Sequence, residues 1–158
     1  MPDFNADNQK KWDLHYMGLA LKQAQVAESK GEVPVGALIV KNNEVISGSY
    51  NKKENGPSAT YHAEVLAIDE ASKKLGAWRL SGCTLYVSLE PCIMCAGAII
   101  SARIDRLVYG AKDPKAGAID SVYHLASDNK LNHSFTVTSG VLESECSIIL
   151  KDFFKSRR

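Results

Sequence analysis

The pattern of hydrophobic and polar positions along the chain predicts a long helix followed by a hairpin. A helical stripe along the first thirty residues predicts a helix from about Asp7 to Ser29. Val35–Val40 is a β-branched apolar run, the turn residues Asn42-Asn43 follow, and Val45–Tyr50 is more polar. We therefore expect a β-hairpin whose second strand lies at an edge of a sheet. The helical stripe that predicts the first helix consists of Trp12, Tyr16, Leu19, Gln23 and Ala27.

Helical and strand patterns alternate along the rest of the chain. The segment Cys92–Ser101 is apolar all round, which predicts burial on most of its sides. Strands that alternate with helices imply a mixed sheet covered on both faces, and a helix before the last strand would let the last two strands run parallel. The expected elements are a helix at His62–Leu75 with Val65, Ala67, Ile68 and Ala71 on its apolar side, a strand at Thr84–Leu89, a helix at Cys92–Ser101, a strand at Arg106–Ala111, a short helix near Val122–Ala126, a strand at Phe135–Thr138, and a last helix with Leu142, Cys146, Ile149 and Phe153 as its stripe.

Length and composition indicate one ordinary globular domain. The 158 residues suit a single domain, and 45% apolar with 23% charged residues argue against disorder or a coiled coil. We therefore expect one α/β domain over residues 1–158, with three α/β/α layers and a mixed five-stranded sheet. The formal net charge of +1 excludes a globally basic nucleic-acid binder but allows a local basic patch.

The cysteines and the N-terminus favour a soluble protein of the cytoplasm. Four cysteines are too few for a disulfide scaffold; we expect Cys83 and Cys146 to fill the core or a strand end. The N-terminus has neither a basic start nor an apolar run, and the longest apolar run, Cys92–Ile100, is too short to cross a bilayer. We expect no signal peptide and no association with a membrane.

Two short motifs carry groups that bind metals and transfer protons. His62-Ala63-Glu64 opens a predicted helix after a loop, and Pro91-Cys92-Ile93-Met94-Cys95 opens another directly after a strand. Alone, the first motif fits a surface histidine beside a solvated glutamate. The second motif alone fits redox chemistry, structural zinc or coincidence. Together, each at the N-terminus of a helix, the two motifs indicate a zinc site.

Helix geometry supports a catalytic rather than a structural zinc site. Cys92 and Cys95 are three residues apart, so they lie on one face of a helix whose N-terminus favours thiolates. With His62 they provide three ligands, which leaves the fourth tetrahedral position for water. We expect Glu64 to reach the site from the first turn of its helix as a carboxylate that transfers protons without binding the metal.

The chain resembles the bacterial tRNA-specific adenosine deaminases, a family of the zinc-dependent cytidine deaminase superfamily. The resemblance runs from about residue 10 to the end. The zinc motifs are shared with cytosine, guanine and cytidine deaminases, whereas the Gly110–Ala118 stretch and the C-terminal end favour the tRNA enzymes. Tyr61 departs from the family's usual alanine, and we expect it to pack on the preceding loop. The residues that carry the resemblance are Val33-Pro34-Val35-Gly36-Ala37, Asn51, His62-Ala63-Glu64, Leu89–Ala98, Gly110–Ala118, Cys146, Asp152-Phe153-Phe154-Lys155 and Arg157-Arg158.

The resemblance implies a fold, a reaction and an assembly. The fold is the cytidine-deaminase-like one, with one Zn²⁺ per chain held by His62, Cys92 and Cys95. A water activated by the zinc attacks C6 of adenine, Glu64 shuttles the proton, and inosine is the product. The implied substrate is the wobble adenosine in the anticodon loop of a tRNA, specifically an arginine tRNA. The resemblance also implies a homodimer that binds the anticodon stem-loop.

The resemblance assigns contacts to the RNA as well. From the residues alone, Asn51 and Asp113-Pro114-Lys115 also fit turns, and Val33 also fits the core. The segment Lys151–Arg158 has four basic residues against one acidic residue, interleaved with two phenylalanines, which suits phosphates and unstacked bases. Phe153 continues the core stripe, so Phe154 is the better candidate for stacking. The implied contacts are Asn51 and Val33 with the extruded nucleoside, the backbone of Ala63 with the base edge, Asp113 and Lys115 with flanking nucleotides, and Phe154 and Arg157 with the RNA.

Two other functions compete with tRNA editing. A small-molecule guanine or cytosine deaminase would use the same zinc chemistry, but it has no physical need for the Asp113–Ala118 loop or the basic, aromatic end. A structural zinc module that binds RNA without chemistry would need a fourth protein ligand and would not need Glu64. The sequence supplies no evident fourth ligand.

Overall fold

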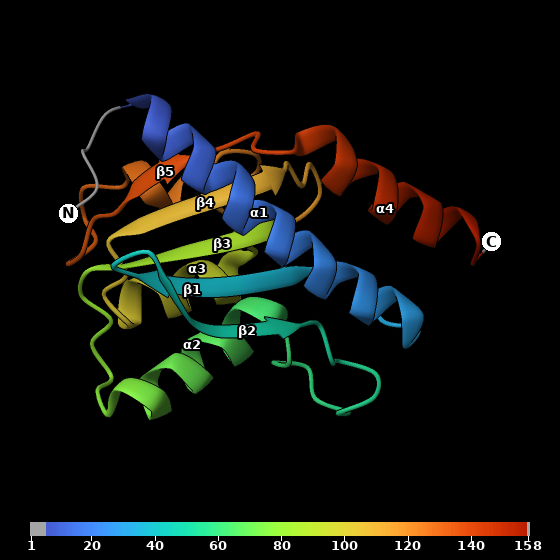
Figure 1. Ribbon diagram of the computed structural model, residues 1–158, viewed down its shortest axis with the longest axis horizontal. Helices are drawn as coiled ribbons and strands as arrows, with labels where there is room; N and C mark the ends of the chain where they lie inside the picture. Colours follow the sequence, from blue (N-terminus) through green and yellow to red (C-terminus); the bar gives the residue numbers. More distant parts are fainter. Residues whose placement is uncertain (1–5, 158) are drawn as a thin grey trace.

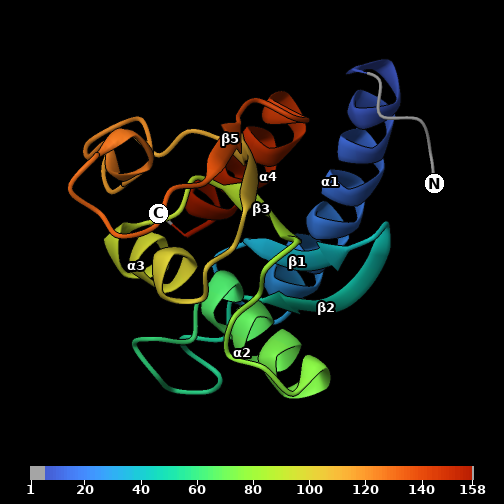
Figure 2. The same ribbon diagram turned by 90° about the vertical axis from the view of Figure 1, so that its left-hand side faces the viewer.

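Five strands form one sheet in the order β2-β1-β3-β4-β5, and helices cover both faces (Figures 1 and 2). This computed structural model describes residues 6–157, so residues 1–5 and Arg158 lie outside the description. The predicted α/β class, the three layers and the mixed five-stranded sheet are confirmed. The strands are β1 (Gly36–Lys41), β2 (Glu44–Tyr50), β3 (Cys83–Leu89), β4 (Arg106–Ala111) and β5 (Thr136–Thr138), and the helices are α1 (Ala6–Ser29), α2 (Ala63–Leu75), α3 (Ile93–Ser101), the 3₁₀ helix η1 (Leu125–Ser127) and α4 (Glu143–Lys155).

Strand pairing follows the expected pattern. β1 pairs antiparallel with both β2 and β3, whereas β3, β4 and β5 are parallel neighbours. The β1–β2 hairpin turns at Asn42 and Asn43, which both have positive φ, a conformation that asparagine tolerates better than most residues. β2 is an edge strand and β4 runs parallel to β5, as predicted.

Alternation along the central strands builds two hydrophobic cores. In β3, Leu85 and Val87 belong to the core that includes α2 and α3, whereas Tyr86 belongs to the core that includes α1. In Figure 2, α1 lies on one side of the sheet and α2 and α3 lie on the other. Cys83 and Cys146 are fully buried and unpaired, as expected of core residues.

The face that α1 buries differs from the predicted stripe. Trp12, Leu19 and Gln23 are only half-buried. The reason is a close approach between α1 and β1, where a Cβ atom added at Gly36 would lie 2.0 Å from the carbonyl oxygen of Ala20. Small side chains are therefore needed on this face, although they carry little hydrophobic signal. The buried residues are Asp13, Tyr16, Met17, Ala20, Ala24 and Ala27.

Three smaller predictions about helices were wrong. α3 is not buried on most sides, because its buried residues are Cys95, Ala96 and Ile99, and Ile93 is 58% exposed. The helix expected near Val122–Ala126 is reduced to the three residues of η1, since the preceding loop folds around a buried carboxylate described below. Val65 and Ile149 are only half-buried, whereas Leu150 is buried.

A buried ion pair ties α1 to the sheet. The carboxylate of Asp13 accepts two hydrogen bonds from Arg106, at 2.8 and 2.7 Å, and one of 2.7 Å from the hydroxyl of Tyr86. Burial raises the pKa of Asp13, but the bonds from Arg106 and Tyr86 outweigh it and lower the pKa below its usual value. This network lies on the α1 side of the sheet.

The strand directions bring several loops to one edge of the sheet. Because β1 is antiparallel to both β2 and β3, the strands β2, β3 and β4 point the same way, and their carboxyl ends meet at that edge. The segments after these strands lead into the N-termini of α2 and α3 and into the loop after β4. Within residues 6–157, none of the helices combines the length and apolarity that crossing a bilayer requires.

Candidate active site

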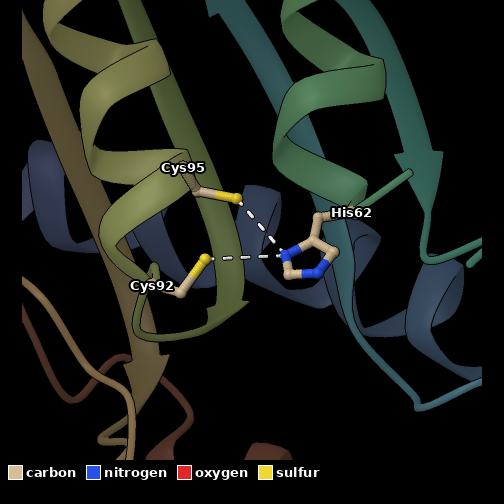
Figure 3. A group of neighbouring side chains, drawn as sticks. All are labelled: His62, Cys92 and Cys95. Atoms are coloured by element: carbon tan, nitrogen blue, oxygen red, sulfur yellow. Dashed lines mark hydrogen bonds between the residues drawn. The ribbon is translucent and has the colours of Figure 1, made fainter. Parts of the chain in front are cut away.

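The two sequence motifs meet at this edge of the sheet. His62 is the N-cap residue of α2 and Cys92 is the N-cap residue of α3, both with extended backbone. Their side chains therefore leave the chain just ahead of each helix, where the backbone N–H groups give a positive potential. Figure 3 shows His62 facing Cys92 and Cys95 across the gap between α2 and α3.

The distances in this group fit a tetrahedral metal ion. Nδ1 of His62 lies 3.7 Å from Sγ of Cys92 and 3.5 Å from Sγ of Cys95 (Figure 3). Zinc with bonds of about 2.3 Å to sulfur and about 2.0–2.1 Å to nitrogen would hold these atoms about 3.6 Å apart. In the described part of the chain the group has three members, which leaves one tetrahedral position for water.

Hydrogen bonds set the proton affinities of the two thiols. Hydrogen bonds from Cys95 and His62 lower the pKa of Cys92 to about 3, although burial raises it. The hydrogen bond to Cys92 and burial raise the pKa of Cys95, and the bond with Cys92 raises that of His62. Because zinc binds thiolates, metal binding would displace the proton of Cys95 and would strengthen as the pH rises.

Glu64 lies beside the group of ligands. It is the second residue of α2, its side chain is buried, and it lines the same cavity as His62 and Cys92. Burial raises the pKa of Glu64 and outweighs the hydrogen bonds with its own backbone N–H and with Cys95, which lower it. A raised pKa brings a carboxyl group closer to the range in which it can both accept and donate protons near neutral pH.

A cavity of about 210 Å³ lies over these groups. It brings together residues that are far apart in the sequence, from the segments before β1 and after β2, β3 and β4. Six predicted site residues line it, and Cys95 is buried against His62 beneath them. The predicted residues in the lining are Val33, Asn51, His62, Glu64, Cys92 and Asp113.

A second cavity of about 540 Å³ adjoins the first and shares Val33, Leu89 and Asp113 with it. Lys115 and Phe154, both predicted site residues, line this second cavity. Its surface is mainly apolar, with three lysine side chains in the lining: Lys112, Lys115 and Lys151. We call it the basic groove.

Two predicted contacts lie outside both linings. Ala63 is fully buried at the first position of α2, between two residues that line the cavity. The guanidinium of Arg157 lies 4.2 Å from the ring centroid of Phe153 instead of in the basic groove. Phe153 is buried and Phe154 is 51% exposed, in agreement with the predicted division between core and surface.

The cavity also contains residues without a predicted role in the site, chiefly Glu90 and Ala116. Glu90 stands directly before Pro91 in the metal motif, which was a signal in the sequence, but its partners are more than twenty residues away. Tyr61 packs on the preceding loop as expected: a Cβ atom added at Gly56 would lie 2.5 Å from its ring.

The fold and the His/Cys/Cys site are those of a zinc-dependent deaminase, and comparison with known protein families agrees with this class. A model of the MafB19-like deaminase family matches residues 11–158. The chain therefore belongs to the MafB19-like deaminase family, and it is an enzyme that removes an amino group by hydrolysis.

Individual proteins that are similar to this chain show to which group of deaminases it belongs. A tRNA-specific adenosine deaminase of Bacillus subtilis is 50% identical over 146 residues, which cover 92% of this chain and 91% of the relative. A solved structure from work on A-to-I editing by tRNA:A34 deaminases at the wobble position is 47% identical, with a TM-score of 0.84 over 86% of this chain and 99% of that one. A guanine deaminase from Bacillus subtilis is 37% identical, with a TM-score of 0.59 over 69% and 66%. The chain belongs to the family of the tRNA-specific adenosine deaminases.

Proposed function

We propose that the protein converts the wobble adenosine of a tRNA anticodon loop, that of an arginine tRNA in particular, to inosine. The observation that carries this proposal is the basic groove, which continues from the metal-site cavity. A free base would fill the small cavity alone, whereas an RNA loop places neighbouring nucleotides beside the extruded base. The lysines of the basic groove suit the phosphates of these neighbouring nucleotides, and its apolar surface suits their unstacked bases.

His62, Cys92 and Cys95 would hold one Zn²⁺ per chain, since their distances and chemistry fit it. When bound, zinc supplies the activation of water for attack on the purine ring. The new C6–O bond uses the oxygen of water, and the C6–N bond breaks to release ammonia. Glu64 accepts the proton of water and delivers protons to the ring and to the leaving nitrogen.

The remaining lining residues would orient the nucleotide. Asn51 is buried at the end of β2 and would hydrogen-bond the nucleoside, while Val33 would pack on the base. The backbone of Ala63 would contact the base edge. Along the basic groove, Asp113 and Lys115 would contact flanking nucleotides, and Phe154 would stack on an unpaired base.

Arg157, two residues beyond the end of α4, would contribute positive charge to the surface that binds the RNA. Since a tRNA is the proposed substrate, we expect the protein to act in the cytoplasm. We also propose that residues 1–158 form one deaminase domain.

We also propose a homodimer in which the outer face of α3 forms the contact. Ile93 is 58% exposed there, Met94 is half-buried, and a Cβ atom added at Gly97 would meet open space. Apolar and small residues on one exposed helix face suit close packing against a second copy. Light scattering should give about twice the chain mass for the wild type and a monomer for Ile93→Glu; a monomeric wild type would contradict the dimer.

The end of α4 should serve RNA binding and not the chemistry. Removing residues 155–158 deletes three basic residues that follow Phe154 in the sequence, but it removes no group that lines the metal-site cavity. We expect weaker tRNA binding, a higher KM, and an unchanged zinc content and single-turnover rate at saturating tRNA. Each lost phosphate contact should flatten the dependence of log affinity on log salt by roughly 0.7–0.9. Equal salt slopes for the full-length and truncated proteins would show that this segment is only solvated.

The proposed function is tested by anticodon stem-loops that differ only at the wobble base. The zinc-loaded protein should release one ammonia per stem-loop with adenosine at this position and none when guanosine replaces it. Free guanine and cytosine serve as rival substrates in the same assay. Faster ammonia release from either free base than from the RNA would favour the small-molecule deaminase instead.

A further inference from the structure

Glu90 is a buried carboxylate for which the proposed chemistry has no use. Its side chain is 2% exposed, and the residue lies between the end of β3 and the metal motif. Its carboxylate accepts backbone hydrogen bonds from two separate stretches of the loop after β4 and one from the hydroxyl of Ser121. The backbone N–H donors are those of Asp113 at 3.1 Å, Ile119 at 3.1 Å, Asp120 at 2.8 Å and Ser121 at 3.0 Å.

The loop of residues 112–121 therefore folds around one carboxylate. Its beginning is held at Asp113 and its end at 119–121, so that the residues between them form a closed turn. Gly117 lies directly on the carboxylate, where an added Cβ atom would be 2.4 Å from Cδ of Glu90. The N–H of Ala118 also donates a 2.8 Å hydrogen bond to the carbonyl of Pro91. The loop is thus anchored to the segment that begins the metal helix.

This anchoring determines what lines both cavities. Asp113 and Ala116 line the metal-site cavity, and Lys112, Asp113 and Lys115 line the basic groove. All four belong to the loop that closes on Glu90. A shift of this loop would move the proposed contacts to flanking nucleotides without moving His62, Cys92 or Cys95.

We propose that Glu90 is a positioning residue for the substrate: it holds the loop of residues 112–121 in the conformation that contacts the RNA beside the extruded adenosine. The identity of the substrate in this inference rests on the proposed function. The carboxylate is required because it offers only acceptors, whereas a glutamine at this position would aim its NH₂ group at backbone N–H donors. An unmatched donor in a buried site is costly, so the loop would give way.

A purely structural role would predict a different result, and Asp13 provides the comparison. Asp13 is also a buried carboxylate that accepts several hydrogen bonds, but it belongs to the buried face of α1 and lines neither cavity. Asp13→Asn should lower the melting temperature and leave the KM for RNA unchanged. Glu90→Gln should raise that KM even where the two variants lose similar stability.

The test compares Glu90→Gln, Gly117→Ala and Asp13→Asn with the wild type. Gly117→Ala keeps the glutamate at position 90, but its Cβ atom would overlap the carboxylate, so the loop and the carboxylate cannot keep their present contact. This variant therefore tests the proposal even if Glu90→Gln fails to fold. Glu90→Gln and Gly117→Ala are the two loop variants, because both disturb the contact between the loop and the carboxylate. For both we expect a KM for the anticodon stem-loop that is at least about tenfold higher than that of the wild type. Their zinc content should be unchanged, and their single-turnover rate at saturating RNA should stay within about threefold of the wild type. A KM for both loop variants within twofold of wild type, or an equal rise for Asp13→Asn, would overturn the proposal.

Amide hydrogen exchange separates this inference from the proposed function. The N–H groups of Ile119, Asp120 and Ser121 should exchange faster in Glu90→Gln and Gly117→Ala, with the remaining protected amides unchanged. This readout needs no substrate. If the wild type forms no inosine in any RNA, the proposed function fails. Even in that case, hydrogen exchange and the affinity for the anticodon stem-loop show whether Glu90 holds the loop. Unchanged exchange at the N–H groups of Ile119, Asp120 and Ser121 would show that it does not.

Discussion

Replacing Glu64 by glutamine is expected to abolish inosine formation while zinc content and melting temperature stay close to those of the wild type. The variant keeps the size and polarity of the buried side chain but removes the group that accepts and donates protons. General acid–base catalysis by one group typically contributes about 10²–10⁴-fold, and Glu64 would serve several proton transfers in the same reaction. We therefore expect the single-turnover rate on an anticodon stem-loop to fall by at least about a hundredfold.

Glu70 offers a matched control for this variant, because it is an exposed glutamate on the same helix, α2. Glu70→Gln should leave the rate and the zinc content unchanged. If Glu64→Gln kept more than about a tenth of the wild-type rate, the proton-transfer role of Glu64 would be wrong.

Replacing Cys92 or Cys95 by alanine should remove the metal and the activity together. Either variant leaves two of three protein ligands, and Cys92 is the more ionised of the two thiols. We expect zinc, measured by mass spectrometry of the purified protein, to fall from about one per chain to a small fraction. The rate should fall by more than about a hundredfold, because water activation depends on the metal.

Cys83→Ala is the control for the loss of a buried cysteine. Cys83 is fully buried at the start of β3, outside the lining of the metal-site cavity. This variant should lose some stability and keep its zinc. Full zinc occupancy in Cys92→Ala or Cys95→Ala would contradict the assignment of these residues as ligands.

The sequence predicted those features that local patterns determine. The β-branched apolar run at Val35–Val40 and the turn at Asn42-Asn43 predicted the correct hairpin, because each depends on a few neighbouring residues. The metal-binding group was predictable because each motif has its own spacing and lies at a helix N-terminus. The structure brings His62 within 3.7 Å of Cys92 and 3.5 Å of Cys95, as the two motifs together predicted.

Other features depend on contacts between distant segments, and the sequence could not predict them. The buried face of α1 is selected by the close approach of Gly36 to Ala20, which no periodicity in α1 records. The exposed outer face of α3 has the same apolar composition as its buried face. The loop around Glu90 joins residues more than twenty positions apart, so the glutamate before Pro91 gave no indication of its partners.

The most direct test of the proposed function is to map inosine in a full set of tRNA transcripts that carry a wobble adenosine. The wild-type protein and Glu64→Gln are incubated in parallel with this set, and inosine is read by sequencing. The proposed function predicts inosine at the wobble position of at least one transcript, the arginine tRNA, with the wild type and none with Glu64→Gln. No inosine in any transcript, with ammonia released from free guanine or cytosine under the same conditions, would contradict it.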